Sequence, residues 1–94
     1  MMFKWLTKKS VQSDQGFIVK FTGKFTAEYR ENEKWIEVEV DNGVMGGTPC
    51  ISIRSSAFAR WSSDGQAIQV EEQQRILKNF RDAMEFQGLA IYVW

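Results

Sequence analysis

The side chains best placed to do chemistry are three carboxylates at alternate positions, Glu37, Glu39 and Asp41, preceded by Trp35. Alternate residues of a β-strand point to the same side, roughly 6.7 Å apart. Parallel carboxylates repel one another, and a basic partner relieves that repulsion and is steered towards it. Tryptophan is among the residue types that anchor protein interfaces. The pattern predicts a surface that binds a basic partner.

The acidic segment extends towards the N-terminus through Glu31 and Glu33, which join the candidate contact residues. Residues 28–41 hold six acidic side chains against two basic ones, although the whole chain has twelve of each sign. The acidity is therefore local, and the net charge of zero hides it. The alternative explanation is an ordinary solvated strand face, whose charges discourage edge-to-edge aggregation.

A second candidate surface is the basic N-terminal segment, which alternates lysines with aromatic residues. Its residues are Lys4, Lys8, Lys9, Lys20 and Lys24 with Phe3, Trp5 and Phe17. Because lysine tracks phosphate and aromatic rings stack on unpaired bases, the alternative function is a small nucleic-acid-binding module. The competing interpretation places the rings in the core and the lysines in water. No recognised RNA-binding motif is present, so nucleic acid is not the partner we expect.

Catalysis and metal binding are not expected from these residue types. The chain has no histidine, the commonest general base and metal ligand, and its one cysteine is Cys50. A single thiol excludes an internal disulfide and a thiolate zinc site. Ser55, Ser56 and Asp64 have no base to take a serine proton. A carboxylate-only enzyme stays formally open without an assignable acid–base pair, so we expect no catalytic residues, metal ligands or cofactor.

Length and composition predict one domain, residues 1–94. The 94 residues are 44% hydrophobic and include one proline, which suits a thin but real core. No segment has the features of a signal peptide, and no apolar run approaches the ~18 residues of a membrane span. Cys50 among apolar neighbours suits a reducing compartment. These features predict a cytoplasmic protein without membrane association, and they leave its oligomeric state open.

Residues 17–29 alternate apolar and polar side chains with a period of two, which is typical of half-buried strands. Gly23 marks either a bend or a hairpin loop. A two-residue loop pairs Phe21 with Thr26 and separates the apolar sets onto opposite faces. A three-residue loop pairs Phe21 with Phe25 and keeps the sets together, so the register favours it.

Residues 34–41 repeat this alternation, with Ile36, Val38 and Val40 on one side. Asn42-Gly43 then predicts a type I′ hairpin turn, which places Val40 opposite Met45. The same ladder puts Ile51 and Ile53 on the side of Ile36 and Val38. The later glycines, Gly46-Gly47, and Pro49 interrupt that ladder, which indicates a bulge or a longer loop there.

Residues 71–87 predict the one long helix, because apolar side chains recur at helical spacing and Gly88 suits the residue after its end. Residues 89–93 alternate again and predict a final strand. The expected fold class is α+β: an antiparallel β-meander sheet, one long helix in the C-terminal half packed across it, and a final C-terminal strand.

From Tyr29 onward the order of features resembles a family of small bacterial immunity proteins from polymorphic-toxin and contact-dependent growth inhibition systems. The matching segments are Trp35 to Asp41, Ile51-Ser52-Ile53-Arg54, Ser55 to Trp61, Gly65-x-x-Ile68, Arg75 to Phe80, Ala83 to Gly88 and Leu89 to Val93. The family commonly has a proline shortly after the tryptophan, where Ser62 and Ser63 stand here.

This resemblance implies a non-enzymatic cytoplasmic protein that binds the C-terminal domain of one cognate toxin and blocks its active site or substrate groove. Many such toxins are nucleases with basic, phosphate-binding sites. The family's partner-facing surfaces diverge, so the resemblance assigns no contact residues. Those residues are predicted from charge and spacing alone: Trp35, Glu37, Glu39, Asp41, Glu31 and Glu33.

Overall fold

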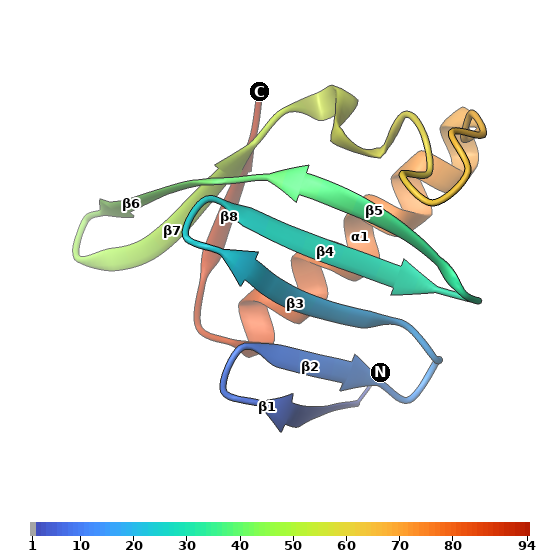
Figure 1. Cartoon of the computed structure of the whole chain (residues 1–94). Helices are drawn as coiled ribbons and strands as arrows, with labels where there is room; N and C mark the ends of the chain where they lie inside the picture. The colour runs from blue at the N-terminus through green and yellow to red at the C-terminus, as the bar shows by residue number, and fades with distance from the viewer. Residues whose placement is uncertain (1) are drawn as a thin grey trace.

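The computed structural model describes residues 2–94 and has two sheets, a long helix and a short 3-10 turn (Figure 1). The first five strands are β1 (Phe3–Thr7), β2 (Ser10–Ser13), β3 (Ile18–Gly23), β4 (Thr26–Glu31) and β5 (Lys34–Glu39). The remaining elements are β6 (Asp41–Met45), β7 (Thr48–Ile53), the 3-10 turn η1 (Ser55–Phe58), α1 (Val70–Phe86) and β8 (Ala90–Val93).

Strands β1 to β5 form a five-stranded antiparallel meander in sequence order. The hairpin predicted at Gly23 is present, but both predicted pairings of Phe21 are wrong, because Phe21 lies opposite Ala27 and Gly23 opposite Thr26. Between these two pairs β3 has one extra residue relative to β4, which is a β-bulge. That bulge keeps the apolar sets of β3 and β4 on one face, as the register argument required, and leaves Phe25 exposed in the turn.

The hairpin predicted at Asn42-Gly43 is wrong, because both residues lie inside β6. The turn falls at Gly46-Gly47, where both residues have positive φ, and Val40 does not pair with Met45. Two successive positive φ angles are the requirement of a type I′ turn, which two glycines meet at least steric cost. The chain therefore continues from β5 through Val40 into β6 and forms a longer hairpin, seen on the left of Figure 1.

The predicted C-terminal strand is present as β8 and pairs in parallel with β7. It completes a second, three-stranded sheet in the order β6-β7-β8, separate from the meander. Ile51 and Ile53 are buried together with Ile36 and Val38, as expected, although they reach the core from this second sheet.

The helix α1 lies across one face of the meander (Figure 1) and agrees closely with the predicted range. It buries Ile76, Phe80, Ala83 and Met84 against the sheets, and Gly88 after its end has φ +83°. Within residues 2–94, no helix combines the length and apolarity that crossing a bilayer demands. The α+β class, the meander, the crossing helix and the final strand are thus confirmed.

The core is one cluster to which both sheets, α1 and η1 contribute. Phe17 and Tyr29 stack with ring centroids 5.4 Å apart, and Phe58 meets Phe80 at 5.5 Å. Phe17 is fully buried, and Phe3 packs partly against the cluster, so these two N-terminal rings face the core. Trp5 lies against Phe86 at the end of α1, with ring centroids 5.8 Å apart, and half of its surface remains exposed.

Candidate functional site

The outer face of β5 carries the predicted acidic row. Glu37 and Glu39 are exposed, whereas Ile36 and Val38 between them are buried, as the alternation predicted. Asp41 continues the exposed row into β6 beyond the buried Val40. β5 is the last strand of the meander, so these three carboxylates lie along an edge of the sheet. We call Trp35, Glu37, Glu39 and Asp41 the acidic edge.

The carboxylates of the acidic edge are not neutralised internally. Within the described part of the chain, Glu37, Glu39 and Asp41 form no ion pair. Glu37 also faces another acid, because it lies directly opposite Glu28 on β4. The Val40 N–H donates to the Phe25 carbonyl at 2.9 Å, which makes Glu37 and Glu28 a non-hydrogen-bonded pair, the kind with the closest side chains. Like charges placed in this way destabilise the sheet.

Glu28 differs from Glu37 in having cations beside it. Its carboxylate is 3.3 Å from Lys20 Nζ and 2.8 Å from an Arg30 guanidinium nitrogen. The side chain is largely buried by these neighbours although it points to the outer face. Lys20 and Arg30 are therefore paired with Glu28, whereas Glu37 has no ion-pair partner among residues 2–94.

Trp35 is held in place at the start of the acidic edge. The Arg30 guanidinium carbon lies 4.9 Å from the Trp35 ring centroid, in the geometry of a cation–π contact. The Trp35 carbonyl accepts hydrogen bonds from the backbone N–H groups of Ser62 and Ser63, at 2.8 and 3.2 Å. About a third of Trp35 remains exposed (36%), so the indole is held by contacts within the chain and is still accessible to solvent.

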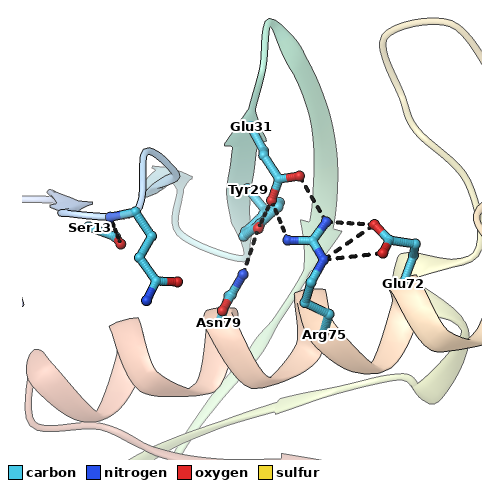
Figure 2. A network of polar contacts seen from close by, with 7 residues as sticks. Ser13, Tyr29, Glu31, Glu72, Arg75 and Asn79 are labelled. Atoms are coloured by element: carbon cyan, nitrogen blue, oxygen red, sulfur yellow. Dashed lines mark hydrogen bonds and ion pairs between the residues drawn. The ribbon is translucent and has the colours of Figure 1, made fainter. Parts of the chain in front are cut away.

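Glu31 does not join the acidic edge, because it lies on the helix-facing side of β4. Its two carboxylate oxygens accept hydrogen bonds from Arg75 of α1, both at 2.8 Å (Figure 2). The hydrogen bonds from Arg75, and a smaller effect of the Tyr29 hydroxyl, hold the pKa of Glu31 below its ordinary value. Arg75 also contacts Glu72 at 2.7 Å. The Glu31 carboxylate therefore links α1 to the meander through Arg75.

Tyr29 also links the meander to α1, beside Glu31 and Arg75. Its hydroxyl donates to Glu31 at 2.6 Å and accepts from the Asn79 amide at 3.1 Å (Figure 2). Burial, with the neighbouring Glu31 carboxylate, raises the pKa of Tyr29 well above its ordinary value. We call Tyr29, Glu31, Glu72, Arg75 and Asn79 the helix–sheet clasp.

Glu33 lies in the β4–β5 turn, at the opposite end of β5 from Asp41. It is exposed and, like its neighbour Asn32, has positive φ, at +66° and +51° respectively. Asparagine tolerates this conformation, whereas glutamate adopts it at a steric cost. The structure therefore separates the six predicted residues into the acidic edge, the isolated Glu33 and the internally bound Glu31.

The exposed hairpin that follows the acidic edge was missing from the predicted contact residues. Every residue from Asp41 to Pro49 is exposed, including Val44 (68%) and Met45 (57%) beside the Gly46-Gly47 turn. The Asn42 side-chain amide donates to the Lys24 carbonyl at 2.7 Å and fixes the base of the hairpin to the meander. Two apolar residues before a double glycine were the available signal. We call residues 41–49 the arm.

No arrangement of these carboxylates suggests a metal centre. From Met2 onward, no group of three or more histidine, cysteine, aspartate or glutamate side chains is placed to hold a metal ion. Cys50 is a buried free thiol beneath the arm. The acidic edge and the arm adjoin each other and are both exposed.

Comparison with known proteins supplies no relative. No protein-family model, no curated protein and no solved structure matches this chain.

Proposed function

We propose that this protein is a cytoplasmic immunity protein, which binds and neutralises the C-terminal toxin domain of a polymorphic-toxin or contact-dependent growth inhibition system. The observation that carries the proposal is the acidic edge: Glu37, Glu39 and Asp41 are exposed, and no cation among residues 2–94 forms an ion pair with them. The order of sequence features from Tyr29 onward, which resembles such immunity proteins, supports it.

A nuclease-type toxin supplies the complementary chemistry, because a site that holds phosphate is basic. The acidic edge would lie over that site and replace the charge of the substrate backbone, while Trp35 packs as the aromatic anchor. The arm continues from the acidic edge, so the apolar Val44 and Met45 would reach further into the toxin groove. A stable complex of this kind buries roughly 1,200–2,000 Å² in total.

The test is protection of growing cells. The C-terminal domain of the protein encoded by the neighbouring gene is expressed as the candidate toxin domain from an inducible promoter in a bacterial host, with and without this protein. We expect growth arrest by the toxin domain and recovery with the wild-type protein. The variant Glu37→Lys, Glu39→Lys, Asp41→Lys should lose protection and bind the toxin domain at least ~100-fold more weakly, because like charges then face the basic site.

The matched control reverses three exposed acids elsewhere, Asp14→Lys, Glu71→Lys and Glu85→Lys, and changes the net charge equally. It should protect like the wild type, and thermal melts verify that both variants fold. Failure of the wild-type protein to protect would reject the immunity role. Full protection by the acidic-edge variant would instead leave the role intact and reject this surface.

A further inference from the structure

The antiparallel meander gathers the lysines of the N-terminal segment at one end of the sheet. In a meander, every second turn lies at the same end, so the β1–β2 turn and the β3–β4 turn are neighbours (left side of Figure 1). These turns carry Lys8, Lys9 and Lys24. Among residues 2–94, none of the three forms an ion pair. Three unneutralised cations therefore lie together at this end.

Two hollows flank the Lys8-Lys9 turn, and neither is lined by an acidic residue. The first, of about 630 Å³, is lined by both lysines together with Lys20 and Arg30 on the outer face, which are paired with Glu28 behind them. The second, of about 590 Å³, is lined by the same two lysines with Lys24 and Trp5, beside the end of α1. Phe21 borders both hollows.

Aromatic rings are exposed at the same end of the sheet. Trp5 is 51% exposed and Phe25 is 54% exposed, and Lys24 Nζ lies 5.4 Å from the Phe25 ring centroid. An exposed ring next to a cation can hold a nucleotide at two points, because the ring stacks on the base while the cation pairs with the phosphate. Phe3 and Phe17, the other rings of the N-terminal segment, are taken up by the core.

We infer that this end of the sheet binds single-stranded nucleic acid, as a second function independent of the proposed immunity role. The backbone would pass over the Lys8-Lys9 turn from one hollow to the other, with unpaired bases against Trp5 and Phe25. A duplex keeps its bases stacked inside and offers nothing to these rings. An anionic membrane would meet concave hollows here, where interfacial binding requires a protruding apolar face.

The test is fluorescence anisotropy with labelled oligo-dT and oligo-U of about 12 nucleotides, at 50 mM and 200 mM salt, a length within the range of small single-strand-binding domains. We expect a Kd in the range of ~10⁻⁵ M at the lower salt. With three phosphates neutralised, log K should fall against log salt with a slope of about −2. The variant Lys8→Gln, Lys9→Gln should bind about tenfold more weakly and lower that slope by about 1.4.

Two further variants separate this site from general attraction to charge. Lys78→Gln, Arg81→Gln removes two exposed cations from α1 and should bind like the wild type. Phe25→Ala, a change in an exposed turn, should weaken binding by about five- to a hundredfold through lost stacking. Equal effects of the two charge variants, or no effect of Phe25→Ala, would overturn the assigned site.

The ligand class is tested in the same assay. A Kd above ~10⁻⁴ M for both oligonucleotides at 50 mM salt, weaker than ordinary non-specific binding, would overturn the inference. Equal affinity for a duplex of the same length, or for vesicles containing anionic lipid, would also overturn it, because neither ligand offers unpaired bases. None of these outcomes bears on toxin neutralisation, which the acidic-edge variant tests.

Discussion

Glu31 and Glu37 are carboxylates on neighbouring strands, and the fold gives them opposite roles. Alternation along β4 and β5 directs Glu31 to the face that α1 covers and Glu37 to the outer face. Glu31 meets Arg75 there, whereas Glu37 meets Glu28. A carboxylate with two good hydrogen bonds stabilises the fold, and a carboxylate opposite another acid destabilises it. The first contributes to stability and the second is available for binding.

The helix–sheet clasp should make stability depend on pH through Glu31. Its folded pKa is lowered beneath the ordinary 4.5, so the unfolded chain takes up protons first as the pH falls. The contribution of Glu31 is therefore complete at pH 7 and is lost as the pH falls from about 4.5 through the folded pKa. We expect Glu31→Gln to lower the free energy of unfolding at pH 7 by about 2 kcal/mol.

Urea denaturation at pH 7 and pH 3 measures both parts of this prediction. The difference between Glu31→Gln and the wild type should be large at pH 7 and should shrink as the pH falls below 4.5 through the folded pKa of Glu31, because the protonated carboxyl and the amide are both uncharged. Glu85→Gln, an exposed acid on α1, is the control and should match the wild type at both values. A constant deficit of Glu31→Gln at both pH values would show that its charge is irrelevant to the clasp.

Sequence reasoning at this scale was accurate for local alternation and failed for distant partners. The exposure of Glu37, Glu39 and Asp41 follows from a period of two, which is visible in the sequence. The role of Glu31 depends on Arg75, 44 residues further along the chain, and no local pattern reports that contact. The position of Trp5 was unpredictable for the same reason, since its ring contacts Phe86, a residue near the other end of the chain.

The arm shows how two competing turn sequences are resolved within one element. Asn42-Gly43 and Gly46-Gly47 both suit a type I′ turn, and only the second pair turns. With the turn at Gly46-Gly47, Asn42 lies opposite Ile51 and its side chain bonds to the Lys24 carbonyl. A turn at Asn42-Gly43 would give up that bond and shorten β6. The longer β6–β7 pairing therefore decides where the turn lies, against the turn preference of Asn42-Gly43.

The position of the turn predicts that one substitution has different effects at two glycines. Gly47 has φ +85°, so Gly47→Ala forces a side chain into the left-handed region and should cost about 1–2 kcal/mol. Gly43 lies in extended strand, and an added Cβ there meets Cys50 Sγ at 3.7 Å, an ordinary contact. Gly43→Ala should change the free energy of unfolding by less than about 0.5 kcal/mol.

Thermal or urea denaturation of the two variants side by side checks this prediction. The replaced atoms are identical, so side-chain size and the gain in chain stiffness cancel in the comparison. A larger loss for Gly43→Ala than for Gly47→Ala would place the turn at Asn42-Gly43 after all, and the exposed arm would not exist.

Elements with a strong internal period were predictable, and pairings between elements were not. The spacing of apolar residues within 71–93 is enough to predict the range of α1 and the alternation of β8. That β8 lies parallel to β7, in a separate sheet from the meander, depends on the length and path of residues 54–89. β1 and β2 also had no predicted counterpart, because lysines and glutamine interrupt the short alternation there.

At the scale of the whole molecule, the charge is neutral in sum and divided in space. The acidic edge occupies one margin of the meander, and the free lysines occupy the end where the β1–β2 and β3–β4 turns meet. Because the Debye length is about 8 Å at physiological salt, a partner at the far end of either region experiences mainly the local charge. The two regions meet at Asp41, since the neighbouring Val40 and Asn42 donate hydrogen bonds to the Phe25 and Lys24 carbonyls.

The shared core predicts that the two sheets unfold together although they are hydrogen-bonded separately. Ile51 and Ile53 of β7 pack in the same cluster as Val19 of β3 and Phe80 of α1. The radius of gyration is 12.5 Å, close to the roughly 12 Å of a compact chain of this length. We expect amide hydrogen exchange to give these four residues one common opening free energy, equal to that of global unfolding.

The arm supplies the contrast in the same experiment. Its residues are exposed and bury little apolar surface, so their amides should exchange by local fraying, at least ~100-fold faster than those of the core. If Ile51 and Ile53 exchanged as fast as the arm while Val19 stayed protected, the second sheet would be a separate, weaker unit. A partner that engages the arm would then have to fold that unit on binding, whereas a shared core presents the arm on a base that is already rigid.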